Sequence, residues 1–316
     1  MVSNKRLIAV TGIYTVIIVG MALMVRVTSR PDTIVANPES TATTTHYIVE
    51  QKIFEPQLVK ASETTAKTDS TVPPQKIGPT ITARAYLVGD IETGETFAER
   101  NINAVLPVAS MSKLITAFVA TDILDSDADI VITEDAMLAP PDTSGIKFGD
   151  TFTLKEILLP LLLNSSNIAA ESLADNDSRE KFLESMNSYA WEVGMPNSYF
   201  ADPSGVSPSN AASATDLFGL AKYLYKFRRD ILKITQSPRV SLASSTDHQG
   251  YEFVSTHPFV HDSRFIGGKT GRTPEAGETM LTILEIDSQL IAVIVLGSSY
   301  GAREADTRLL LQKIFP

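Results

Sequence analysis

The chain has 316 residues with 43% hydrophobic and 20% charged side chains, enough for one large packed domain or two small ones. It contains no cysteine, which excludes disulfides, cysteine-ligated zinc, iron–sulfur clusters and a cysteine nucleophile. The net charge is −10, and the part from residue 81 onward carries 19 basic and 31 acidic side chains. Because a surface that follows nucleic-acid phosphates is basic, nucleic acid is not an expected partner.

The four histidines are too few and too scattered to indicate a metal cluster. His257 and His261 are four residues apart, but Pro258 between them opposes the shared helical face that this spacing needs. We therefore predict no metal site and no cofactor.

The first predicted element is a membrane-spanning helix over residues 7–25, a run of 19 residues without a charge. Such a helix is about 28 Å long, close to the hydrocarbon thickness of about 30 Å. No Ala-x-Ala follows the run, so we predict an uncleaved signal anchor over residues 1–27. Lys5 and Arg6 before the run and Arg26 after it weakly favour an N-terminus inside and the rest of the chain outside.

The second predicted segment is a Thr/Ser/Pro-rich tether over residues 28–80. Its 53 residues include 11 Thr, 4 Ser, 6 Pro and a single Gly. Such a composition buries too little apolar surface to offset the entropy of ordering the chain. A flexible coil of this length spans on average roughly 40 Å, which keeps the following domain near the membrane but clear of it.

The remaining residues, 81–316, predict an α+β domain. Its first elements are two strands over 81–89 and 95–100, joined by a turn at Asp90–Gly94. Helices follow over 107–124, 153–175 in at least two pieces, 178–193 and 215–227. The pattern then changes to strands over 264–270, 280–286 and 290–296, before an amphipathic helix over 302–314. Strands near both ends predict an antiparallel sheet with an inserted helical subdomain and a site in the seam between them.

The most informative feature of this domain is the order of three motifs, which begins with Ser110-Met-Ser-Lys113. Ser110 and Lys113 are three residues apart on a predicted helix, so their side chains share a face. A neutral lysine could take the serine proton, but an ordinary lysine has a pKa near 10.4 and is charged. Burial and a second cation such as Lys269 would lower that pKa. The alternative is a helix-capping serine beside a solvated lysine.

The second motif is Ser165-Ser-Asn167, which interrupts a mostly apolar helical stretch. Polar side chains buried there without partners would be unfavourable, so they either cap the next helix or line a cleft. The third motif is Lys269-Thr-Gly271, at the end of a predicted strand and followed by Arg272. Glycines leave the strand backbone open to an extended peptide that pairs along its edge. A Gly-rich turn with a solvated lysine is the alternative.

The domain resembles the low-molecular-mass penicillin-binding proteins, the serine-type D-alanyl-D-alanine carboxypeptidases among the β-lactamase-like serine enzymes. The resemblance rests on four stretches, AYLVGDIETGETFAERNINAVLPVASMSKLITA, LLNSSNIAAESLA, FADPSGVSPSNAASATDLFGLAKYL and GGKTGRTPEAGETML. It implies a β-lactamase/transpeptidase-like fold whose substrate is the D-Ala-D-Ala end of peptidoglycan stem peptides, with β-lactams as inhibitors.

The resemblance also implies roles for the motif residues. Ser110 would be the acylated nucleophile and Lys113 its base. Ser165 would relay protons and Asn167 would hold the substrate. Lys269 and Thr270 would bind the terminal carboxylate beside Gly271, and the backbone amides of Ser110 and Arg272 would form the oxyanion hole.

Several functions remain open on the sequence alone. The leading expectation is a single-pass cell-membrane carboxypeptidase with its catalytic domain outside the cell. A D,D-endopeptidase that cuts peptidoglycan cross-links would use the same residues. A β-lactamase usually needs an added carboxylate base, and no Glu-x-x-Leu-Asn block is found. A non-catalytic penicillin sensor or a structural envelope protein completes the set.

Overall fold

The computed structural model describes residues 80–316 apart from 141 and 177, and the predicted anchor and tether lie outside these residues. In the described part of the chain, no helix is long and apolar enough to span a membrane. The boundary predicted near residue 81 therefore stays a prediction.

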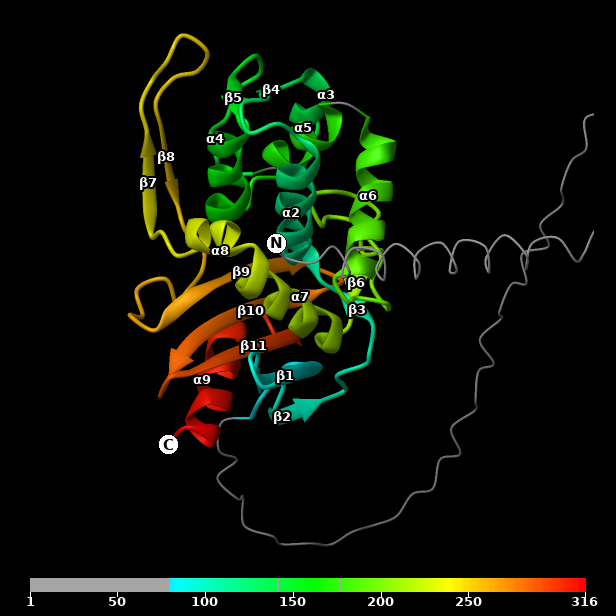
Figure 1. Cartoon of the computed structure of the whole chain (residues 1–316), viewed down its shortest axis with the longest axis vertical. Helices are drawn as coiled ribbons and strands as arrows, with labels where there is room; N and C mark the ends of the chain where they lie inside the picture. The colour runs from blue at the N-terminus through cyan, green and yellow to red at the C-terminus, as the bar shows by residue number, and fades with distance from the viewer. Residues whose placement is uncertain (1–79, 141, 177) are drawn as a thin grey trace, which may run out of the picture. The chain divides into compact units, whose positions relative to one another are not determined.

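A five-stranded antiparallel sheet forms the base of the domain (Figure 1). Its strands, in spatial order, are β2 (Thr96–Arg100), β1 (Ala85–Asp90), β11 (Gln289–Ser298), β10 (Gly277–Ile286) and β9 (Phe265–Thr273). The N-terminal strand β1 pairs with the C-terminal strand β11, with Ala85 opposite Leu296. The sequence prediction of a sheet built from both ends of the domain is thus confirmed.

Alternating side chains of the central strands fill two separate cores. On one face Leu281 and Ile294 belong to the larger core, which also takes in helix α7 (Ala214–Phe227). On the other face Met280 and Val295 pack with the closing helix α9 (Arg303–Ile314). Because both faces are covered, residues 280–286 of β10 and 290–296 of β11 are mostly apolar, which is why the sequence shows them as apolar runs.

The inserted helical subdomain is organised around α2 (Lys113–Ile123). Its first eight residues, Lys113 to Ala120, are all buried. The helices that surround it are α4 (Leu154–Leu159), α5 (Asn167–Asp175) and α6 (Arg179–Glu192). Figure 1 shows this group above the sheet, with α2 in its middle. The buried start of α2 places the predicted base at the junction of helices and sheet.

Two predicted helices differ in detail from the structure. The helix predicted over 107–124 starts with a 3-10 turn, η1 (Ala109–Ser112), before α2 begins. The helix predicted over 153–175 is broken, as expected, by a π-helical turn η2 (Pro160–Asn164) and by Ser165 in a left-handed conformation with φ 63°. The turn η1 carries Ser110, and η2 ends directly before Ser165.

Several short elements were not predicted. They are β3 (Leu106–Pro107), β4 (Asp129–Val131), α3 (Glu134–Met137), β5 (Thr151–Thr153), β6 (Ala211–Ala212), α8 (Arg229–Thr235), β7 (Arg239–Leu242) and β8 (Tyr251–Val254). Most are two to four residues long, too short for a hydrophobic period to show. Strand β7 alternates between exposed and partly buried positions, which weakens its apolar signal, whereas β8 alternates between exposed positions and the buried Tyr251 and Phe253.

Candidate active site

Ser110 sits on a strained turn that presents its hydroxyl to a cleft. The residue before it, Ala109, has φ 51°, a left-handed conformation that is rare for a residue with a Cβ. The turn lacks a side-chain cap, and its N-cap position is Val108, so the alternative of a capping serine does not hold for Ser110. Lys113 is buried, so a solvated lysine is excluded too.

Lys113 has three oxygen partners. Its Nζ lies 3.1 Å from Ser110 Oγ and 2.8 Å from Asn167 Oδ1, and it also donates to the backbone oxygen of Ser204. The last two are acceptors only. A neutral amine has two N–H groups and one lone pair, so those two oxygens take the N–H groups and leave the lone pair for the Ser110 hydroxyl. The geometry is therefore that of a base poised on a serine.

The protonation state of Lys113 agrees with that geometry. Burial lowers the pKa of Lys113 from its usual 10.5 to about 7, while the carboxylates of Asp202, Asp142 and Glu171 raise it and limit the shift. From the sequence, Lys269 was expected to contribute to the lowering of the Lys113 pKa. In the structure the repulsion between the two lysines instead lowers the pKa of Lys269.

The second motif divides its work between its two serines. Ser166 is the cap, because its Oγ accepts from the backbone N–H of Ala169 at the start of α5. The left-handed Ser165 faces the strand instead, where its Oγ accepts from Lys269 Nζ at 2.8 Å. The cap and cleft interpretations of this motif were thus both correct, each for a different serine.

The third motif lies on β9 against the turn of Ser110. Lys269 is 1% exposed, and its Nζ also donates to the backbone oxygen of Thr270 at 3.1 Å. Burial, the charge of Lys113 and that of Arg303 hold the pKa of Lys269 well below its usual range. A Cβ on Gly271 would approach the backbone oxygen of Val108 to 2.8 Å, so a larger residue would push the strand off the turn. The solvated-lysine alternative therefore fails here as well.

An open cleft of about 300 Å³ connects the three motifs. The predicted residues that line it are Ser110, Ser165, Asn167, Thr270, Gly271 and Arg272. Lys113 and Lys269 are buried and reach the lining through their hydrogen bonds to Ser110 and Ser165. The structure thus brings all eight predicted residues together. The Arg272 side chain is exposed; its guanidinium lies 5.1 Å from the centroid of the Tyr300 ring and 4.0 Å from the Glu278 carboxylate.

Sequence reasoning missed the turn that holds Lys113 from behind. The buried carboxylate of Asp202 accepts five hydrogen bonds from residues 204–207, four of them from backbone N–H groups. This turn presents the Ser204 oxygen to Lys113. A Cβ on Gly205, which has φ 83°, would come within 2.1 Å of the Ala109 oxygen. The stretch Asp202-Pro-Ser-Gly205 is a turn signal, but nothing in it indicates that the turn contacts Lys113.

Three further side chains of the cleft were also missed. Arg303, at the start of α9, donates to the Gly271 oxygen at 2.9 Å. Thr256 lies 3.1 Å from Thr270, hydroxyl to hydroxyl. Asp142 accepts from Ser166 Oγ at 2.7 Å and so ties its own loop to the start of α5. All three line the cleft.

A serine within hydrogen-bond reach of a buried, near-neutral lysine defines a serine hydrolase whose base is a lysine. Comparison with known proteins agrees. A family model described as D-alanyl-D-alanine carboxypeptidase matches residues 68–299. The chain belongs to this family, which confirms the sequence prediction of a serine peptidase of the low-molecular-mass penicillin-binding class.

Relatives in the family carry two activities in their names. A D-alanyl-D-alanine endopeptidase of Pseudomonas aeruginosa is 30% identical over 249 residues, 72% of this chain and 76% of the relative. A D-alanyl-D-alanine carboxypeptidase of Bacillus subtilis, DacF, is 28% identical over 226 residues, 69% of this chain and 58% of the relative.

Solved structures share the fold. A D-alanyl-D-alanine carboxypeptidase of Mycobacterium tuberculosis superposes with a TM-score of 0.68 at 26% identity, covering 74% of this chain and 91% of that one. Penicillin-binding protein D2 of Listeria monocytogenes, in its cefotaxime-bound form, has a TM-score of 0.66 at 27% identity and covers 76% of this chain and all of that one. The predicted β-lactamase/transpeptidase-like α+β fold is confirmed.

Proposed function

We propose that this chain removes the terminal D-Ala from peptidoglycan stem peptides through an acyl-enzyme on Ser110. The observation that carries the proposal is the Lys113 amine, held on Ser110 Oγ with its pKa brought to about 7. A catalytic base works best when its pKa lies near the operating pH.

Each half of the reaction has residues suited to it. Lys113 takes the Ser110 proton while Ser110 Oγ bonds to the carbonyl carbon of the penultimate D-Ala. The peptide C–N bond then breaks, the leaving amine receives by way of Ser165 the proton that Lys113 took, and D-Ala departs. Water next attacks the ester carbon, its proton passes through Lys113 to Ser110 Oγ, and the bond between the ester carbon and Ser110 Oγ breaks to release the shortened peptide. Lys269, Thr270 and Arg303 surround the place for the terminal carboxylate.

Intact-mass spectrometry of the full-length chain after incubation with benzylpenicillin tests the nucleophile. We expect one adduct per chain in the parent and none in Ser110→Ala. A folded parent without an adduct would sink the proposal. Release of the drug is expected to be slow, and many turnovers per second would instead indicate a β-lactamase.

The second candidate, cross-link cleavage by a D,D-endopeptidase, is favoured by the name of the Pseudomonas aeruginosa relative. One substrate pair separates the two. A soluble pentapeptide ending in D-Ala-D-Ala reports carboxypeptidase activity by the D-Ala released, and a purified cross-linked dimer reports endopeptidase activity by the monomers formed. We expect the pentapeptide to be the faster substrate, and the reverse ranking would select the endopeptidase.

We further propose that residues 7–25 anchor the enzyme in the cell membrane and that the domain faces outward. The support is the uncharged run of 19 residues and the chemistry, since peptidoglycan lies outside the membrane. Full-length protein should stay with membranes after alkaline carbonate washing, and a variant without residues 7–25 should be washed off. Equal release of both would contradict anchoring.

A further inference from the structure

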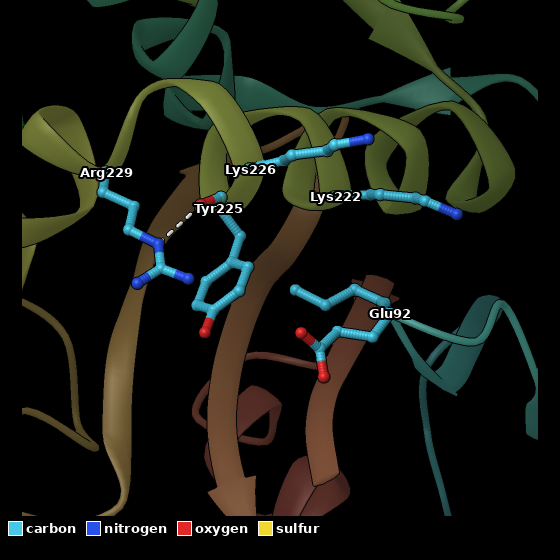
Figure 2. Close-up of a pocket in the computed structure, with 6 residues that line it drawn as sticks. Glu92, Lys222, Tyr225, Lys226 and Arg229 are labelled. Carbon is cyan, nitrogen blue, oxygen red and sulfur yellow. Dashed lines mark hydrogen bonds between the residues drawn. The ribbon is translucent and has the colours of Figure 1, made fainter.

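A second pocket lies on the sheet side of α7, built by residues with no place in the cleft. Its volume is about 370 Å³, and it is lined by Ile91, Glu92, Lys222, Tyr225, Lys226 and Arg229. Figure 2 shows the Tyr225 ring projecting between Arg229 and Glu92, with Lys222 and Lys226 on the same helix. None of these six residues lines the catalytic cleft.

The pocket is basic although the domain around it is acidic. Residues 81–316 carry 31 acidic side chains against 19 basic ones, yet three cations gather here. Within the described residues, neither Lys222 nor Lys226 forms an ion pair, whereas the neighbouring Arg228 pairs with Asp230 at 3.0 Å. Glu92 is the one carboxylate that lines the pocket in the described part of the chain, so the lining keeps a net positive charge.

The cation best placed for recognition is Arg229. Its Nε donates to the Tyr225 backbone oxygen at 2.8 Å, and its guanidinium lies 4.0 Å over the Tyr225 ring. These two contacts fix the plane of the guanidinium and leave its two terminal nitrogens for a ligand. A guanidinium held in one plane suits a carboxylate, which it binds through two parallel hydrogen bonds.

The opposite wall supplies the complement. The Glu92 carboxylate makes no ion pair among the described residues, and buried Ile91 gives the pocket an apolar floor. A carboxylate facing several cations across an apolar floor suits a ligand with both signs of charge. A short peptide with free carboxylates and an amine has this chemistry.

We propose that this pocket is a second binding site, which takes an acidic stem-peptide segment and holds the polymeric substrate on the enzyme. The inference rests on the proposed function for the identity of the polymer. An enzyme domain with a net charge of −12 repels an anionic polymer overall, so a local cationic pocket supplies the attraction. A flat bilayer surface would fit this concave site less well than a discrete peptide.

The test compares two triple variants of the full-length chain. Lys222→Gln/Lys226→Gln/Arg229→Gln neutralises the pocket. Lys155→Gln/Lys181→Gln/Lys313→Gln removes three exposed lysines elsewhere and changes the net charge equally. Binding is measured by co-sedimentation with purified peptidoglycan sacculi at low salt. Activity is measured as D-Ala release from sacculi and from a soluble pentapeptide.

We expect the pocket variant to lose about tenfold in sacculus binding and in activity on sacculi, but to keep its rate on the pentapeptide. The control variant should match the parent in all three measurements. Parental binding by the pocket variant, or equal losses in both variants, would overturn the inference. Vesicle binding is compared between the parent and the pocket variant, both without residues 7–25, because the proposed anchor would itself bind a bilayer. Binding of this parent to anionic phospholipid vesicles that is as tight as to sacculi and is lost in the pocket variant would also overturn the inference and would identify a membrane contact.

Failure of the proposed function has a separate signature. The proposed function is refuted if no β-lactam acylates the parent protein and the parent releases no D-Ala from either substrate. Co-sedimentation with sacculi still reports on the pocket in that case, because it requires no turnover.

Discussion

Two buried lysines lie under one cleft and differ in the charges around them. Lys113 is 0% exposed and Lys269 is 1% exposed, so burial lowers the pKa of both. Carboxylates act on Lys113 and keep its pKa at about 7. The charges that act on Lys269 are cations, Lys113 and Arg303, and its pKa is held well below the usual range.

The comparison teaches that neighbouring charges, rather than burial, separate a base from a binding group. The carboxylates near Lys113 keep its pKa near neutral pH, where the amine can both accept a proton and return it. Among the residues that the structure describes, no carboxylate acts on Lys269, and the terminal carboxylate of a substrate would supply one. Binding of substrate is therefore expected to raise the pKa of Lys269 and to draw a proton onto it.

The largest expected effect comes from removing the base. Lys113→Met keeps the apolar stem and deletes the amine, so Ser110 loses its proton acceptor. We expect the rate of acylation by benzylpenicillin to fall about 10³-fold, within the range for general-base catalysis. Time-resolved intact-mass spectrometry measures it, and circular dichroism confirms that the variant folds. A fall of less than tenfold would mean that another group is the base.

Lys269→Met breaks the other half of the comparison. The substitution removes a desolvated cation from the place where the substrate carboxylate would bind. We expect kcat/KM to fall about 30-fold, which corresponds to about 2 kcal/mol of transition-state stabilisation. Lys155→Met, at an exposed position, is the control. On a pentapeptide amidated at its C-terminus, the parent and the variant should have similar kcat/KM values. A large difference on this substrate would argue against a contact between Lys269 and the substrate carboxylate.

Asp202→Asn tests the carboxylate that acts most strongly on Lys113. Lys113 must be neutral to act, so the acylation rate should rise with pH through about 7. Asp202 raises the pKa of Lys113, so neutralising it should move this rise to lower pH. Asp202→Glu keeps the charge and should leave the position of the rise unchanged. A purely structural role would lower the rate at every pH without moving the profile.

The last expected effect is on stability rather than on the rate of the reaction. Unfolded Lys113 has a pKa of 10.5 and folded Lys113 about 7, so between these values the unfolded chain binds a proton that the folded chain lacks. Stability therefore rises with pH across this window, by at most about 1.4 kcal/mol per pH unit from this group. Urea unfolding at pH 7, 8 and 9 measures the slope, which should be shallower in Lys113→Met. An unchanged slope would mean that folded Lys113 stays charged.

The sequence predicted the residues proposed to carry out the chemistry better than the residues that hold them in place. Ser110, Lys113 and Lys269 lie in motifs whose side chains do the chemistry, so their types and spacing carry a signal. Ser204 acts through a backbone oxygen, which any residue possesses, and only the fold brings it to Lys113. Arg303 lies 34 positions after Lys269, and its contact with Gly271 depends on how α9 packs against the sheet.

The same distinction holds for the fold. The sheet was predicted because β10 and β11 are long and apolar, and such runs need no tertiary knowledge to be recognised. The π-helical turn Pro160–Asn164 was expected only as a break, since its geometry depends on the packing of η2 against its neighbours. The left-handed φ of Ala109 was unforeseen, because alanine ordinarily avoids it.

The place of β9 at one end of the described sheet also bears on self-association. A strand with an unpaired edge is a template on which other chains of the same protein can add and aggregate. Here the neighbouring η1 and α8 pack against β9, so a bulky folded chain meets steric obstruction where a slender extended peptide does not. Access to the catalytic edge and resistance to aggregation are then two results of one arrangement, and trimming those elements to widen the cleft would endanger solubility.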